Sequence, residues 1–267
     1  MSTATLEFKK QVDQEILEPE RMKDLPMAMD SYRWMFNASR RPAKPVDFLI
    51  KFSASNKHIL VIRKNQFFKV LHEVDDKQLN TAELQHHFEQ VYAIAERSPA
   101  LGILTTENRD VWANTREVLL AAHPANAMAL EDIEAASFVV CLDDAAPVTL
   151  EERVKQYLYG DGQNRWFDKP AQFIINDNGT AGFNGEHSMM DGTSTHRLND
   201  YVCKVAFNDQ LDISDRHGAV RSNLPDPTVI KFHFTEEVQA EIDRAQKDFN
   251  KVIGLHDLRV QAYQGYR

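Results

Sequence analysis

Cysteine is scarce in this sequence, with only Cys141 and Cys203 among 267 residues. Two cysteines are too few for a disulfide framework, and this scarcity is typical of a reducing compartment. Long apolar runs are missing as well. None approaches the roughly 20 residues of a membrane-spanning helix, so we expect a soluble chain without a transmembrane segment.

Targeting and phosphate-binding signals are also missing. Residues 1–17 contain no apolar signal core and are too acidic for a transit peptide, so no targeting signal is visible. The loop at residues 160–163 contains two glycines but lacks the lysine-serine/threonine ending of a P-loop and the strand before it, which indicates a turn. No internal repeat, low-complexity tract or obvious domain linker divides the chain.

Basic residues are fewer than acidic residues in this sequence. The 31 Lys and Arg residues stand against 40 Asp and Glu, which gives a net charge of −9 at pH 7. Nucleic-acid binding needs a basic surface, so this balance argues against a nucleic-acid partner. Hydrophobic residues make up 43% of the chain, which is enough for a sizeable core.

Strands and helices alternate along the sequence, which predicts an α/β fold with a mixed sheet flanked by helices. Residues 3–37 are expected to form helices broken around Pro19 and Pro26. Capping pairs at Asn80 and Thr149 mark two helix starts. Hydrophobic periodicity predicts further helices at residues 106–122, 126–136 and 235–254, a hairpin at 58–70, a polar connection at 209–227, and strands at 138–142, 228–234 and 255–264.

Several polar residues are expected to be structural. His58 starts a strand, whereas His86 and His87 lie largely off the apolar stripe of a helix and point in different directions, so they make a poor metal pair. Asp143 and Asp144 end a strand and have no partner ligands at a suitable spacing. The sequence therefore predicts no metal site.

Two charged segments have simple interpretations. Arg40 and Arg41 are expected to be solvated loop residues rather than a binding site. The run NRWFDK at residues 164–169 is expected to form a buried polar network that shapes the approach to a later strand. Its polar and aromatic members are Asn164, Arg165, Trp166 and Asp168.

The clearest candidate for catalysis follows a predicted hairpin. Residues 173–176 and 181–183 have the composition of two short strands, and Asn178-Gly179 between them is typical of a tight turn. The second strand ends near His187, and Asp191 stands four residues later at the start of a helix that runs to about residue 207. A histidine and a carboxylate are thus expected together.

This pair has the chemistry of an acyl transferase. A hydroxyl or thiol needs a base to take its proton during attack, and imidazole has its ordinary pKa in the useful range. His187 would be that base, and Asp191 would orient its ring or hold the loop by pairing with a basic group. The alternative is a structural histidine. His196 lies too far along the chain for easy local contact and is disfavoured as a second catalytic histidine.

Five separate runs, in order along nearly the whole chain, resemble the carnitine/choline acyltransferases. The resemblance is greatest to fungal-type carnitine O-acetyltransferases. The runs are PMAMDSYRWMF at residues 26–36, LTTENRDVWANTR at 104–116, FVVCLDD at 138–144, NRWFDK at 164–169 and EHSMMDG at 186–192.

This resemblance implies a fold and a domain organisation. Members of the family have two domains, each similar to chloramphenicol acetyltransferase, with the active site in a tunnel between them. Residues 1–267 would form most of the N-terminal, catalytic-histidine domain, and the C-terminal domain would be absent. The coenzyme A-binding run is expected after Arg267, and the carnitine-binding residues belong to the second domain.

The resemblance also implies a reaction. An acetyl or other short acyl group would move between coenzyme A, a co-substrate rather than a bound cofactor, and the hydroxyl of carnitine. His187 would be the general base, and Asp191 a supporting carboxylate whose partner is an arginine of the missing domain. Family members imply a mitochondrial or peroxisomal location.

Three hypotheses remain open for the chain itself. It is expected to be an incomplete, inactive fragment of a carnitine acetyltransferase, completed by the missing C-terminal domain. Alternatively, the acceptor is choline or the acyl group is longer. The third hypothesis is a non-enzymatic truncated remnant that folds and binds partners.

Overall fold

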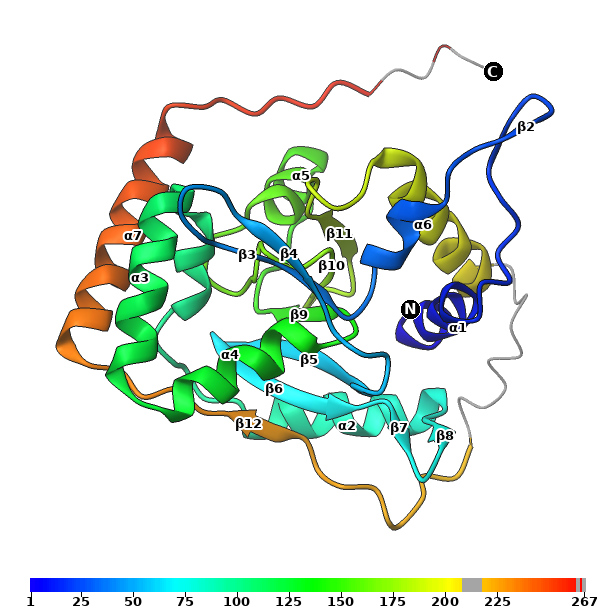
Figure 1. Cartoon of the computed structure of the whole chain (residues 1–267), viewed down its shortest axis with the longest axis horizontal. Helices are drawn as coiled ribbons and strands as arrows, with labels where there is room; N and C mark the ends of the chain where they lie inside the picture. Colours follow the sequence, from blue (N-terminus) through cyan, green and yellow to red (C-terminus); the bar gives the residue numbers. More distant parts are fainter. Residues whose placement is uncertain (208–217, 263–264, 266–267) are drawn as a thin grey trace.

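A six-stranded mixed sheet forms the centre of the computed structural model, which describes residues 1–207, 218–262 and 265 (Figure 1). Neighbouring strands follow the order β11-β10-β9-β5-β6-β12. Their bounds are β5 His58–Arg63, β6 Gln66–Leu71, β9 Val139–Asp143, β10 Ala171–Asn176, β11 Ala181–Gly185 and β12 Thr228–Ile230. The predicted α/β class with a mixed sheet is confirmed.

The middle of the sheet is parallel and its outer strand pairs are antiparallel. Strand β9 pairs in parallel with both β5 and β10, so that Cys141 lies between Ile62 and Ile174. Lys64 and Asn65 join β5 to β6 with φ values of 51° and 66°, the left-handed conformation of a two-residue hairpin turn. The predicted hairpin over residues 58–70 is therefore confirmed.

Helices cover the face of the sheet from which the odd-numbered side chains of β5 project. Ile59 and Val61 are fully buried in this layer. Helices α1 (Ser2–Asp13), α2 (Thr81–Ile94) and α6 (Gly192–Phe207) contribute to the same core, and α1 contacts both of the others. In Figure 1, α1 and α6 lie together at the right of the sheet.

The even-numbered side chains of β5 enter the second layer. Leu60 and Ile62 pack in a core that contains Trp112 and Trp166, whose rings meet edge to face. This layer is built from η2 (Leu101–Thr106), α3 (Arg109–Ala122), α4 (Ala125–Ala135) and α7 (Glu236–Gly254). The side chains of β5 thus point alternately into the two layers. Because both faces of the sheet are covered, every residue of the strand is buried.

The helix starts predicted at Asn80, Thr149 and Thr235 are confirmed, whereas the helix predicted from residue 106 begins at Arg109. Asn80 accepts a hydrogen bond from the Glu83 amide while the Glu83 side chain accepts one from the Asn80 amide, which completes a capping box on α2. Thr149 caps α5 (Leu150–Leu158) in the same way. Thr235 caps α7 through the Val238 amide.

Both ends of the chain differ from expectation. After α1, residues 14–37 contain short hairpin strands β1 (Arg21–Met22) and β2 (Leu25–Pro26) and a 3-10 helix η1 (Asp30–Trp34) instead of further α-helix. Two prolines and the positive φ of Lys23 (55°) are incompatible with a continuous helix there.

The C-terminal strand predictions are wrong in part. Strand β12 stops at Ile230 because its pairing with β6 ends at Phe67. Residues 255–262 form no strand, and residues 263–264 of that prediction lie outside the described residues, as do 209–217 of the predicted polar connection. Four further hairpin strands were missed alongside β1 and β2: β3 (Ala38–Arg41) with β4 (Phe48–Lys51), and β7 (Glu73–Val74) with β8 (Lys77–Gln78).

No helix among residues 1–207 and 218–262 has both the length and the apolar character needed to cross a membrane.

Candidate active site

The hairpin of β10 and β11 places the candidate histidine at one edge of the sheet. Ala171, the first residue of β10, pairs with Gly185, the last residue of β11. The loop from Glu186 to Asp191 therefore leaves the sheet where its parallel strands begin. The turn of the hairpin forms as predicted, with Gly179 at φ 78°.

Two methionines hold this loop on the core. Met189 and Met190 are buried and pack in the layer that contains Leu198 and Val202 of α6. The neighbouring side chain of His187 points the other way and is 82% exposed. The loop thus combines two methionines that are buried in the core with a histidine that faces solvent.

The structure brings His187 and Asp191 together. His187 Nε2 lies 3.4 Å from Asp191 Oδ1, and the Asp191 side chain is 90% exposed. Asp191 Oδ1 also accepts a hydrogen bond from the Gly192 amide at 2.7 Å, and its carbonyl accepts one from Ser194 Oγ at 3.0 Å. The carboxylate therefore stands at the start of α6, as its helix-start position predicted, although it bonds the first helical amide rather than the second or third.

Glu186 was not predicted as a site residue, yet it is the most constrained side chain of the loop. Its carboxylate is only 8% exposed. One oxygen accepts from Arg40 Nη1 at 3.1 Å, and the other accepts from the amide and the hydroxyl of Ser188 at 2.9 and 2.7 Å. The Glu186 carboxylate therefore links the residue before His187 to the residue after it, and to Arg40.

The interpretation of Arg40 and Arg41 as solvated loop residues is wrong. Both lie in β3, where Arg40 Nε also donates to Asp47 Oδ2 at 2.7 Å. Arg41 pairs with Glu134, which accepts from Arg116 Nη2 at 2.8 Å as well. Pairing across the fold, rather than the chain nearby, decides where these side chains lie.

The predicted polar network of residues 164–169 is confirmed. Arg165 is almost wholly buried and donates to both carboxylate oxygens of Asp143, at 2.8 and 2.7 Å. Asn164 donates to the same carboxylate at 2.8 Å. Asp143 is thus the counter-charge of a buried arginine, which explains its place at the end of β9.

The second half of that network reaches β3. Asp168 accepts from Arg109 Nη1 at 2.7 Å and from Trp112 Nε1 at 2.8 Å, and burial raises its pKa to about 6 in spite of these donors. Its carbonyl accepts from the Arg40 amide at 2.9 Å. Lys169 is completely buried, which lowers its pKa to about 7, and donates to two carbonyls at the end of α4.

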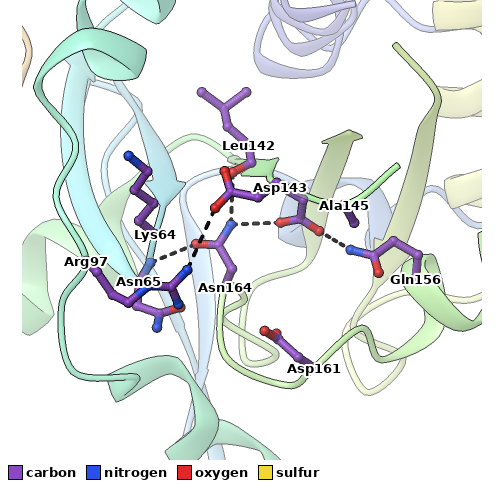
Figure 2. Close-up of a pocket in the computed structure, with 10 residues that line it drawn as sticks. Lys64, Asn65, Arg97, Leu142, Asp143, Ala145, Gln156, Asp161 and Asn164 are labelled. Atoms are coloured by element: carbon purple, nitrogen blue, oxygen red, sulfur yellow. Dashed lines mark hydrogen bonds and ion pairs between the residues drawn. The ribbon is translucent and has the colours of Figure 1, made fainter. Parts of the chain in front are cut away.

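A polar pocket of about 270 Å³ lies at the carboxyl ends of the parallel strands β5 and β9, whereas the His187 loop lies where the parallel strands begin (Figure 2). Figure 2 shows Asn164 between Asn65 and Asp143 in its wall. The acidic groups there already have partners, since Asp143 binds Arg165 and Asp144 lies 3.1 Å from Arg63. This pocket is separate from the His187 loop.

The histidines that the sequence predicted to be structural lie in different environments. His58 is buried, as predicted, and its Nε2 lies 2.7 Å from the Asp132 carbonyl; burial lowers its pKa to about 4. His87 is buried beside Gln90 whereas His86 is exposed, so the prediction that both lie off the apolar stripe is wrong for His87. Within the described part of the chain, no three His, Cys, Asp or Glu side chains are grouped to hold a metal ion.

Comparison with known proteins identifies a family to which this sequence is similar. A sequence model of the family described as "Choline/Carnitine o-acyltransferase" matches residues 1–267. The mitochondrial carnitine O-acetyltransferase of Saccharomyces cerevisiae is 36% identical over 99% of this chain and 41% of its own length. The choline O-acetyltransferase of Danio rerio is 28% identical over 99% of this chain and 44% of its own.

A third relative differs in the acyl group of its name. The mitochondrial carnitine O-palmitoyltransferase 2 of Mus musculus is 31% identical over 91% of this chain and 36% of its own length. The chain therefore spans less than half the length of each of these relatives.

Proposed function

The chain belongs to the choline/carnitine O-acyltransferase family, and on that premise we propose that it carries the general base for acetyl transfer between coenzyme A and carnitine. The observation that carries the proposal is the placement of His187. Its imidazole faces solvent at the end of β11, beside the Asp191 carboxylate, on a loop that is fixed on both sides of the histidine. This is the arrangement that a base needs in order to meet a mobile substrate.

The proposed reaction moves one proton, forms one bond and breaks another. His187 takes the proton of the carnitine hydroxyl while that oxygen attacks the thioester carbonyl of acetyl-CoA. The new carbon–oxygen bond forms, the carbon–sulfur bond breaks, and the proton passes from the imidazolium to the leaving thiolate. In the reverse direction the same nitrogen takes the proton of the coenzyme A thiol. Asp191, 3.4 Å from Nε2, favours the imidazolium that exists between these steps.

We infer that further polypeptide completes the site. A polar contact as exposed as that of His187 with Asp191 is weakened by water. Oxyanion donors and the exclusion of water each contribute strongly to acyl transfer, and one missing donor typically costs about 10² to 10³ in rate. The coenzyme A site is proposed to lie beyond Arg267, in a second domain that covers the loop, and the 267-residue chain alone is proposed to be inactive.

The acceptor and the acyl length have a second candidate each. The relative named for choline supports choline as the acceptor, and the relative named for palmitoyl transfer supports a longer acyl group. Acetyl and carnitine are preferred because the 36% identical relative is named for both. Mitochondrial location is proposed from the names of relatives, and peroxisomal location from family resemblance only.

The experiment is an assay of thiol release from acyl-CoA. Two proteins are compared: the 267-residue chain, and a chimera in which it replaces the matching segment of the Saccharomyces cerevisiae relative. We expect turnover in the chimera with acetyl-CoA and carnitine, and a much lower rate with choline or palmitoyl-CoA. A preference for choline or palmitoyl-CoA would select the second candidate. A properly folded chimera without any transfer would favour the non-enzymatic remnant.

A further inference from the structure

We propose that Arg40 and Glu186 form a positioning pair that fixes the orientation of the His187 loop, an inference that rests on the proposed function. Within the described residues, neither side chain forms a hydrogen bond or ion pair with His187. They act through the backbone on either side of it.

The first step is the geometry of Glu186. One carboxylate oxygen binds Arg40 Nη1 at 3.1 Å, and the other binds the amide and the hydroxyl of Ser188 at 2.9 and 2.7 Å. The Glu186 amide also donates to the Pro170 carbonyl at 3.3 Å. His187, between Glu186 and Ser188, is therefore held by hydrogen bonds that its own exposed ring does not make.

The second step is the rigidity of Arg40. Its amide donates to the Asp168 carbonyl at 2.9 Å, and its Nε donates to Asp47 Oδ2 at 2.7 Å. Asp47 is in turn bound by Arg109, whose other end binds the buried Asp168. The guanidinium that reaches Glu186 is thus also held by Asp47, and a charge-assisted hydrogen bond to such a donor is stronger than one between neutral groups.

The third step is the requirement of the reaction. A general base works only when its nitrogen lies within hydrogen-bond reach of the proton that it removes, and a misplacement of about 1 Å can cost about 10² in rate. The ring of His187 is 82% exposed, so packing around the ring cannot supply this order within the described chain. The loop backbone has to supply it, and the Glu186 side chain bonds to that backbone directly beside the histidine, at the Ser188 amide.

The first test measures loop order in the 267-residue chain and needs no activity. Amide exchange and ¹⁵N relaxation at His187 and Ser188 are compared in wild type, Arg40→Ala, Arg40→Lys and Glu186→Gln. We expect exchange to become about tenfold faster in Arg40→Ala, with smaller changes in Glu186→Gln and partial recovery in Arg40→Lys. If Arg40→Ala fails to fold, Glu186→Gln, which preserves size, decides the question.

Arg221→Ala is the matched control. Arg221 pairs with Glu83 at the start of α2, and the exposed fractions of the two side chains, 27% and 2%, resemble the 29% and 8% of Arg40 and Glu186. It should lower stability without changing exchange at Ser188. Equal loop exchange in wild type and Glu186→Gln, or equal loosening in Arg221→Ala, would overturn the proposal.

The second test uses the chimera and separates this inference from the proposed function. A positioning role predicts that Arg40→Ala lowers kcat on the order of tenfold to a hundredfold with little change in the KM for carnitine, and that Arg40→Lys recovers part of it. If the loop loosens but kcat stays at the wild-type value, the positioning role is wrong. If His187→Ala itself leaves kcat unchanged, the proposed function is wrong whatever the loop does.

Discussion

Buried ionisable side chains are a prominent feature of the fold at the scale of single residues. Burial lowers the pKa of His58 to about 4 and that of His72 to about 3. Both rings carry no charge in the native state at neutral pH, where His58 Nε2 meets a carbonyl and His72 Nε2 meets Ser137 Oγ. Such groups make stability depend on pH.

The sign of that dependence follows from proton binding. Below pH about 6.5 the unfolded chain binds protons at these histidines that the native protein does not, so the free energy of unfolding falls as pH decreases toward 4. For His58 the loss is about 3 kcal/mol. Urea unfolding from pH 7 to 4 checks this. The fall in the free energy of unfolding with decreasing pH should be smaller in His58→Gln than in wild type. It should equal that of wild type in the exposed control His86→Gln. Identical slopes in His58→Gln and wild type would contradict the account.

Asp191 gives a second prediction, because its two roles can be separated. Asp191→Ala removes both the acceptor of the Gly192 amide and the charge beside His187, so it should lower stability by about 0.5 to 1 kcal/mol and reduce turnover of the chimera. Asp191→Asn keeps an acceptor oxygen and should keep the melting temperature while turnover still falls. An unchanged melting temperature in Asp191→Ala would show that the helix-start bond contributes nothing.

How far the sequence could predict the site depends on distance along the chain. His187 and Asp191 meet because a hairpin ends and a helix begins within six residues of each other, and both signals are local. Arg40 and Glu186 are 146 residues apart, and no turn or periodicity relates them. Their pairing depends on the tertiary arrangement that brings β3 beside the end of β11.

Elements were predictable where they carry their own signals. Capping boxes at Asn80 and Thr149 and the two-residue turn between β5 and β6 depend on neighbouring residues, and the structure contains them. The tail after Gly254 has strand-like composition, yet residues 255–262 pair with no described strand. A strand exists only when a partner offers its hydrogen bonds, which composition cannot supply.

The contact between η2 and the loop before residue 166 gives a prediction at this scale. A Cβ at Gly102 would lie 2.1 Å from the Arg165 carbonyl oxygen and 2.4 Å from that of Gln163, and backbone atoms cannot rotate away. Gly102→Ala should therefore destabilise the protein by about 3 kcal/mol. Gly254→Ala is the control, because nothing lies within 4 Å and alanine favours the helix end. Equal melting temperatures for the two variants would contradict this packing.

The whole molecule is a sheet covered on both faces, with its candidate base at an edge. The layers of α1, α2 and α6 on one face and of η2, α3, α4 and α7 on the other fix the sheet, and the sheet fixes the start of β10 and the end of β11 (Figure 1). The candidate pair of His187 and Asp191 lies outside both layers, in solvent. This arrangement supports a division of labour in which this chain supplies the base and a second domain supplies the enclosure.

The central claim, that His187 is the general base of acetyl transfer, is tested most directly by kcat in the chimera. His187→Ala is measured beside His196→Ala, which removes an exposed histidine from the neighbouring helix α6. The account predicts that His187→Ala lowers kcat by about 10² to 10⁴ with little change in the KM for carnitine, and that His196→Ala keeps the wild-type rate. A folded His187→Ala chimera that turns over as fast as His196→Ala would contradict it.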